Sequence, residues 1–237
     1  MSEKKTFLSV SAHVGDGALS SGPFLAQMVQ QGHEAYILDL TPGERGHPRM
    51  TPEDYRRQKL EEAQSFADAI GATSIVFDEY SDGFLEANDE VASKVALLIR
   101  QLKPDVMVTH WVNSIHRDHA YAAKIADRGR FLAGLPGGID TDLPRHGVSQ
   151  FFFAENWEDM DGFVADTYVP IGEEAFEAWL AGISTHAFAR GETYGFRYID
   201  YYTSLMGVRG ALAGGVGFPR AIAMAQEAGQ HRVITDF

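Results

Sequence analysis

The chain has 237 residues, is 45% hydrophobic, carries a formal net charge of −13 and contains no cysteine. This length can bury one substantial core, and the acidic balance argues against binding to nucleic acid or to an anionic membrane. Without cysteine there is no disulfide, thiolate metal site or cysteine nucleophile, so any metal must be held by histidine and carboxylate groups. No apolar run reaches the length of a transmembrane helix or resembles a signal peptide, so we expect a cytoplasmic protein.

The first two thirds of the chain alternate short apolar runs with amphipathic segments, which is typical of βαβ units around a parallel sheet. Thr51 and Pro52 supply a cap and a first residue for one helix, and an apolar stripe at helical spacing marks another over 91–102. Strands are predicted at 6–12, 35–40, 74–77, 106–109 and 151–154, and helices at 52–70, 91–102 and 118–132, with a further helix starting at Pro23.

The last third of the chain is less regular. A strand is expected at 167–171 and a helix at 173–186, whereas the aromatic and glycine-rich region 194–217 gives mixed signals. The pattern predicts one α/β domain over residues 1–237, with a Rossmann-like parallel sheet that has helices on both faces. Its core is expected at about 6–155, followed by a C-terminal elaboration at about 156–237.

Two polar clusters follow two of the predicted strands. His13 and Asp16 come after the first strand, and residues 116–119, His-Arg-Asp-His, come after the fourth. In the common strand order 3-2-1-4-5 these strands are neighbours at the point where the order reverses, which is where open sheets bind ligands. We therefore predict that the clusters meet, and that His13, Asp16 and His119 hold Zn²⁺ or another divalent ion such as Fe²⁺ or Mn²⁺. Taken alone, the second cluster is equally typical of a solvated helix start capped by Asp118.

A dinucleotide-binding loop is the rival interpretation of the first cluster. Gly15 and Gly17 follow the first strand and Asp39 ends the second, as in the dinucleotide fingerprint. The third glycine of that fingerprint is missing, because Ser20 stands in its place. A histidine and an aspartate in the turn are also unfavourable neighbours for a pyrophosphate, so the metal site is the stronger hypothesis.

Together, the motifs Ala-His-Val-Gly-Asp at 12–16 and His-Arg-Asp-His at 116–119 resemble those of the LmbE/PIG-L superfamily of metal-dependent de-N-acetylases. The likeness covers about residues 6–135, including Gly-Glu-Arg-Gly at 43–46. It implies a zinc-dependent hydrolase that releases acetate from an N-acetylated sugar or similar small amide, and commonly a homo-oligomer. It also implies metal ligands at His13, Asp16 and His119, with His116 beside the substrate carbonyl and Asp118 holding the His116 ring.

The sequence departs from that family pattern at Gly15, where the family carries the aspartate that usually acts as general base. Ser114 likewise replaces a tyrosine that some members have. Three explanations stay open. Glu44 can serve as the base; or the reaction can be the hydration of a small unsaturated dicarboxylate, as in superfamily members with this variant motif, with Glu44 and His116 transferring protons. Alternatively, the protein binds a ligand without turning it over.

Each of the remaining candidate residues can have a purely structural role as well as a functional one. Arg45, and with less support Arg117, can grip a substrate carboxylate or lie on the surface. His186 falls near the place of a family pocket histidine. His110 ends the fourth strand and is expected to be a buried, hydrogen-bonded core residue. Aromatic residues that can line the substrate cavity, or simply pack, are Trp157, Tyr198, Tyr201 and Tyr202.

Overall fold

The computed structural model describes residues 3–158, 161–214, 217–226 and 232–237, and over these residues an eight-stranded sheet runs through the molecule. Its order is β3-β2-β1-β4-β5-β7-β6-β8, so the predicted order of the first five strands, 3-2-1-4-5, is confirmed. These five strands are parallel, whereas β7 pairs antiparallel with both β5 and β6. The strands are β1 (Thr6–His13), β2 (Glu34–Thr41), β3 (Thr73–Val76), β4 (Val106–His110), β5 (Gln150–Ala154), β6 (Thr167–Pro170), β7 (Ala221–Ala225) and β8 (Arg232–Val233).

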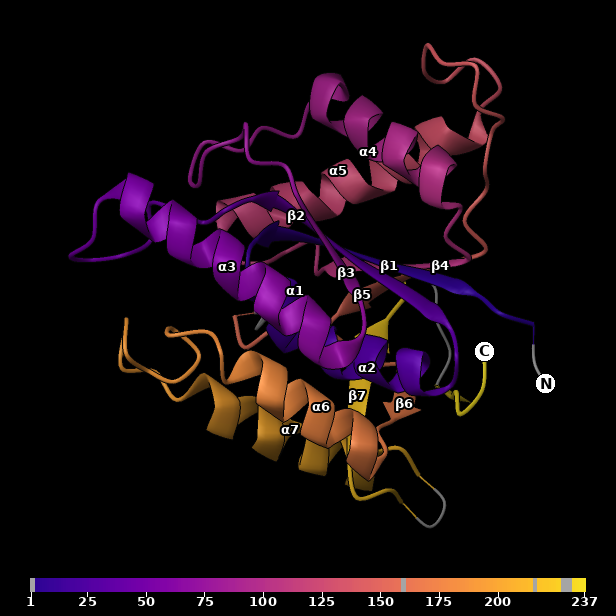
Figure 1. Cartoon of the computed structure of the whole chain (residues 1–237). Coiled ribbons are helices and arrows are strands. Elements are labelled where there is room, and N and C mark those ends of the chain that lie inside the picture. The colour runs from indigo at the N-terminus through magenta and orange to yellow at the C-terminus, as the bar shows by residue number, and fades with distance from the viewer. Residues whose placement is uncertain (1–2, 159–160, 215–216, 227–231) are drawn as a thin grey trace.

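Helices cover both faces of the sheet (Figure 1). On one face lie α4 (Asp89–Leu102) and α5 (Arg117–Gly134); on the other lie α1 (Asp16–Ser20), α2 (Gly22–Gln30), α3 (Pro52–Ile70), α6 (Glu173–Ile183) and α7 (Tyr198–Leu212). Successive residues of β1 point to opposite faces, so Phe7 joins one apolar cluster while Leu8 and Val10 join the other. The predicted α/β class, with helices on both faces, is therefore confirmed.

Local chemistry fixes the helix ends that the sequence marked. The hydroxyl of Thr51 accepts the backbone N–H of Asp54, Pro52 begins α3, and Gly71 ends it in the left-handed conformation. Most boundaries differ from the prediction by one or two residues, as at α2, which begins at Gly22. The largest difference is at α6, which ends at Ile183 because the chain turns tightly, with the N–H of Thr185 bonded to the Gly182 carbonyl.

The C-terminal third packs into the same core as the first part. Trp179 of α6 is fully buried and its indole N–H donates to the carbonyl of Ala18 at 2.8 Å. The region 194–217, whose sequence gave mixed signals, contains α7, which packs on the core through Tyr202 and Met206. No helix among the described residues is both long and apolar enough to cross a membrane.

Candidate functional site

A cavity of about 240 Å³ opens at the carboxyl ends of β1 and β4, where the strand order reverses. Both predicted polar clusters reach it, together with segments that lie far away in the sequence. The residues that line it are His13, Val14, Asp16, Leu19, Gly43, Gly46, Tyr55, Lys59, Asp82, His116, His119, Asn156, Trp157, Glu158, Phe188, Tyr194 and Tyr198. The two loops therefore meet at the cavity, as predicted.

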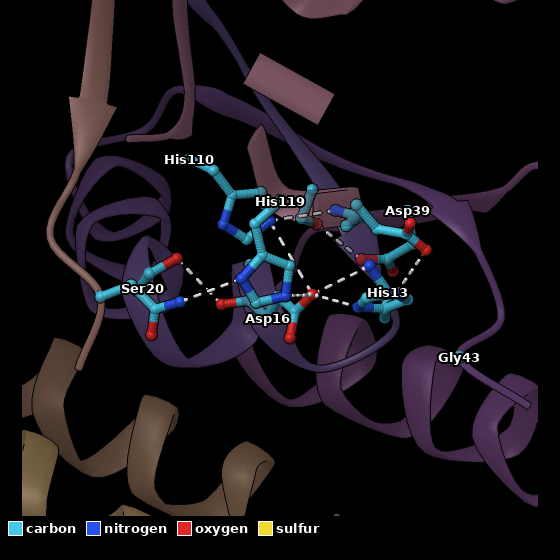
Figure 2. A network of polar contacts seen from close by, with 12 residues as sticks. His13, Asp16, Ser20, Asp39, Gly43, His110 and His119 are labelled. Carbon is cyan, nitrogen blue, oxygen red and sulfur yellow. Dashed lines mark hydrogen bonds and ion pairs between the residues drawn. The ribbon is translucent and has the colours of Figure 1, made fainter. Parts of the chain in front are cut away.

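The carboxylate of Asp16 lies between two histidine rings (Figure 2). Its Oδ2 atom is 3.0 Å from Nδ1 of His13 and 3.1 Å from Nε2 of His119. Gly15, with φ of 105°, turns the chain so that Asp16 begins α1 directly above the end of β1. Burial opposes ionisation of Asp16, but His119 and His13 together hold its pKa well below the usual range. The carboxylate is thus in the charged form that binds cations.

His119 is held from behind by a second set of polar groups. Its Nδ1 atom lies 3.2 Å from Oε2 of Glu158, 3.4 Å from Nδ2 of Asn156 and 3.5 Å from Oγ of Ser114. Burial acts to lower the pKa of His119, but Asp16 and Glu158 outweigh it and raise that pKa to about 9. A carboxylate behind a histidine fixes the ring orientation, so Nε2 stays directed at Asp16.

His13 has carboxylates behind it as well. Its Nε2 atom lies 3.1 Å from Oδ1 of Asp82 and 3.2 Å from Oδ2 of Asp118, while the N–H of Gly83 donates to Asp118 at 2.7 Å. The prediction that Asp118 orients the His116 ring is therefore not what the structure shows. His116 itself is the N-cap of α5, and Asp118, in the first turn, contacts the ring of His13 instead. The interpretation of Asp118 as helix cap is also wrong, because the N-cap of α5 is His116.

His110 and His116 flank this pair of histidines. His110 is buried and stacks on His119 with ring centroids 4.3 Å apart, and its Nε2 accepts the N–H of Ala12 at 3.0 Å. It is thus the hydrogen-bonded core residue that was expected. His116 lines the cavity, 4.5 Å from the ring of His119, and burial followed by the charges of His119 and His13 lowers its pKa. His116 is therefore a neutral imidazole facing the cavity, a form that can donate or accept a proton.

Glu44 and Arg45 lie beside the cavity without lining it. The Glu44 carboxylate is buried, and it accepts hydrogen bonds from the hydroxyl of Ser81 and, at 3.2 Å, from the N–H of Asp82. The guanidinium of Arg45 bonds to the Ser81 hydroxyl at 2.6 Å and lies 5.1 Å from the ring centroid of Phe84. Asp82, in the loop after β3, does line the cavity, and sequence reasoning missed it. The position of Asp82 in the loop that follows the third predicted strand could have identified it as a candidate, because that loop leaves the same edge of the sheet.

Gly15 and His186 do not line the cavity themselves, and both lie against the ring of Phe188, which does. A Cβ atom on Gly15 would lie 2.5 Å from Cε1 and 2.6 Å from Cζ of Phe188, and 3.3 Å from Cδ2 of His186. His186 is fully buried, and burial together with the charges of Lys59 and Arg190 lowers its pKa. The predicted contact of His186 with substrate is therefore not supported, because His186 is fully buried and is not among the residues that line the cavity.

The remaining candidates divide between lining and packing. Trp157 and Tyr198 line the cavity, whereas Tyr202 is buried and its hydroxyl donates to Asn156 at 2.6 Å. Asp39, the acid of the rival dinucleotide interpretation, is buried with the Ser11 hydroxyl donating to it at 2.7 Å, so it is not placed to bind a ribose.

The donor set fits a divalent metal ion. Among the described residues, three groups of three offer ligand atoms within 4.8 Å of one another: His13, His116 and His119; Asp16, His110 and His119; and His13, Asp82 and Asp118. Each group contains His13 or His119, but none contains His13, Asp16 and His119 together, so that ligand set stays a prediction. Imidazole nitrogen with ionised carboxylate oxygen suits zinc, iron or manganese.

Known proteins share this sequence pattern and fold. Residues 8–128 match the family model described as PIG-L, GlcNAc-PI de-N-acetylase. The 4-oxalmesaconate hydratase of Pseudomonas putida is 28% identical over 142 residues, which cover 56% of this chain and 55% of that protein. A 1D-myo-inositol 2-acetamido-2-deoxy-alpha-D-glucopyranoside deacetylase 2 of Catenulispora acidiphila is 28% identical over 189 residues, covering 64% of this chain and 60% of that protein. The chain thus spans a little over half the length of these curated relatives.

Among solved structures, the 4-carboxy-2-hydroxymuconate hydratase of Pseudomonas putida KT2440 has the same fold. It superposes with a TM-score of 0.84 at 21% sequence identity, covering 98% of this chain and 99% of that one. The whole described architecture, including the C-terminal third, is therefore that of a known fold.

Proposed function

The chain belongs to the PIG-L family, whose model is described as a GlcNAc-PI de-N-acetylase. Within this family, we propose that it is a metal-dependent enzyme that adds water to the double bond of a small unsaturated dicarboxylate. The curated relative with hydratase activity in its name motivates the reaction class. The geometry around Gly15 favours this reaction over amide hydrolysis.

The observation that carries the proposal is the contact between Gly15 and Phe188. The related de-N-acetylases place their usual base at this position, and glycine cannot accept a proton. The Phe188 ring also fills the space that a longer side chain would need, since a Cβ there would come within 2.5 Å of it. The cavity is thus built without a base at this point, so the reaction must take its proton transfers from other groups.

His13, Asp16 and His119 are the residues that would hold the metal, with zinc preferred and iron or manganese as alternatives. A divalent ion bound there would polarise a substrate oxygen and make bound water more acidic. The carboxylates behind His13 and His119 keep both rings directed at this point.

Two side chains on the cavity wall can carry the protons of a hydration. As the water oxygen bonds to one alkene carbon, the Asp82 carboxylate accepts the water proton, and the imidazole of His116 acts as a relay: one ring nitrogen takes up a proton while the N–H of the other delivers its proton to the second carbon. The sum is the addition of one water molecule, and proton exchange with solvent resets both groups. Glu44, the base suggested by the sequence, is in this scheme a positioning residue that holds the Asp82 backbone.

De-N-acetylation of an N-acetylated sugar or similar small amide is the second candidate. The matching family model and the deacetylase relative favour it. In this case Asp82 would have to replace the missing base at residue 15 and act on the attacking water.

The two candidates separate in one experiment. Protein loaded with Zn²⁺, Fe²⁺ or Mn²⁺ is offered 4-oxalmesaconate and other unsaturated diacids, followed by loss of enoate absorbance, and a panel of N-acetyl sugars, followed by acetate release. Hydration of a diacid that is abolished by His119→Ala is the expected result. Acetate release without hydration would overturn the proposal in favour of the deacetylase. Turnover of neither class would identify a ligand-binding relative.

A further inference from the structure

Lys59 of α3 is a buried cation in the wall of the cavity. The residue is only 4% exposed, yet it lines the same cavity as His116 and His119. Within the described part of the chain, no carboxylate lies within ion-pair distance of its ammonium group, and it is the only lysine or arginine in the lining. A buried charge without a partner is unfavourable, so its position needs an explanation.

Aromatic faces surround the ammonium instead of carboxylates. Its Nζ atom lies 4.3 Å from the ring centroid of Phe188 and 5.6 Å from that of Tyr55. Such faces attract a cation but do not neutralise it. Burial lowers the pKa of Lys59, and the more distant carboxylates, with Glu62 and Asp16 foremost, act in the opposite direction.

The carboxylates of the lining are already engaged by histidines. Asp16 and Asp82 contact His13 at 3.0 and 3.1 Å, and Glu158 contacts His119 at 3.2 Å. Lys59 is therefore the charged group of the lining that lacks a counterion.

The same Phe188 ring connects Lys59 with Gly15. The ring contacts the ammonium, and it occupies the place of a side chain on Gly15. An acidic residue at position 15 would bring a fixed negative charge to this side of the cavity. With glycine there, the cation faces the cavity without that charge.

We propose that Lys59 binds a carboxylate group of the substrate, and so makes the site selective for a dicarboxylate over a neutral amide or sugar. The idea rests on the proposed function for the identity of the substrate, and it adds the residue that recognises its charge. The second carboxylate or its neighbouring oxygen is left to face the histidine cluster.

The test compares Lys59→Met with Lys59→Arg. Methionine keeps an unbranched apolar stem that is one atom shorter than lysine and has no charge, whereas arginine restores a cation. Lys124→Met, at an exposed site on α5, is the matched control. Calorimetric titration of zinc-loaded protein uses succinate, which has no double bond to react, and monomethyl succinate, which carries one charge fewer.

Wild type should bind succinate more tightly than its monomethyl ester. Lys59→Met should weaken succinate binding by about tenfold or more and abolish the difference between the two ligands, because a hydrogen bond to a charged group is lost. Lys59→Arg should restore most of the affinity and Lys124→Met should change nothing. With a reacting diacid, Lys59→Met should raise KM far more than it lowers kcat, and metal content and Tm should not fall.

Three results would overturn the inference: no succinate binding by wild type, equal affinity in Lys59→Met, or a lower Tm or metal content in that variant, which would indicate a structural role. Failure of the proposed function is a separate result. If succinate binding depends on Lys59 but no diacid is hydrated, the anion site stands and the reaction is wrong. If diacids are hydrated and Lys59→Met changes neither KM nor affinity, the reaction stands without the anion site.

Discussion

The carboxylate of Glu44 accepts a hydrogen bond from the backbone N–H of Asp82 at 3.2 Å, and the Asp82 side chain in turn reaches to 3.1 Å from Nε2 of His13. Two acids from the loops after β2 and β3 thus stand in series. Glu44 holds the backbone of the loop after β3, and Asp82 lines the cavity. Their roles in proton transfer should differ accordingly.

Asp82→Asn should lower kcat by about a hundredfold or more, because it removes a proton acceptor from the cavity while keeping its shape. Glu44→Gln should lower kcat by roughly tenfold, since the amide oxygen can still accept one of the two hydrogen bonds. Steady-state kinetics on the reacting substrate, with metal content measured in both variants, checks this. A larger loss of kcat in Glu44→Gln than in Asp82→Asn would instead identify Glu44 as the group that accepts the proton.

The metal site should depend on each of its three ligands. His13→Ala, Asp16→Ala and His119→Ala are each expected to lose most of the bound metal, because three protein ligands are the usual minimum for a catalytic site. Elemental analysis of purified protein measures the content. His146→Ala serves as control, because His146 bonds to the carbonyl of Pro104 on another part of the molecule. Unchanged metal in the three ligand variants would dismiss the assignment.

Gly15 should not tolerate a side chain. Gly15→Ala is expected to lower the free energy of unfolding by about 2 to 4 kcal/mol, from a positive φ and from overlap with Phe188. Gly32→Ala is the matched control: its φ is 90° but nothing lies within 4 Å of the added Cβ, so only the backbone term of about 1 kcal/mol remains. Urea unfolding compares the two, and equal losses would show that Phe188 gives way at no cost.

The same contact gives a gain-of-function experiment. In Gly15→Asp alone, the Phe188 ring stands in the way of the new carboxylate. Combining it with Phe188→Ala makes room for that carboxylate at the position where the related deacetylases carry their base. Acetate release by the double variant, and not by Gly15→Asp alone, is the expected outcome, measured on the N-acetyl sugar panel.

Asp39 should make stability depend on pH. Burial raises the pKa of its carboxyl from 3.8 to about 7, although the Ser11 hydroxyl bonds to it. The folded state therefore holds this proton more tightly than the unfolded chain does, and the stability this confers is present below about pH 4 and lost as the pH rises through 7. Asp39→Asn should be more stable than wild type by about 1 to 3 kcal/mol at pH 8, and the difference should vanish toward pH 4. Urea unfolding of metal-free protein measures it, and a pH-independent difference would contradict the shift.

The C-terminal third should unfold together with the rest. Trp179→Ala is expected to lower the free energy of unfolding by about 3 to 5 kcal/mol, because it empties a fully buried site between α6 and α1. Far-UV and near-UV circular dichroism should report one coincident transition in wild type and variant alike. Two separate transitions would instead divide the chain near residue 155, at the predicted border between core and elaboration.

Much of the fold was predictable because its signals are local. The cap at Thr51 and the stop at Gly71 set the ends of α3 through contacts a few residues apart. Alternating apolar strands and amphipathic helices then leave few topologies, and the rule for parallel sheets placed the loops after β1 and β4 together. By contrast, α7 escaped prediction because apolar residues lie on its exposed sides too, such as Val208 and Leu212, so no single face stands out.

The sequence by itself determined the α/β sheet, the meeting of His13, Asp16 and His119, and the missing acid at Gly15. Only the tertiary structure decided which groups surround them: Asp82 and Asp118 behind His13, Phe188 against Gly15, and Lys59 facing the cavity. A motif fixes which side chains leave one end of a strand, because neighbours in sequence stay neighbours in space. Contacts between segments as far apart as residues 15 and 188 depend on how helices pack across the sheet, and no local pattern carries that information.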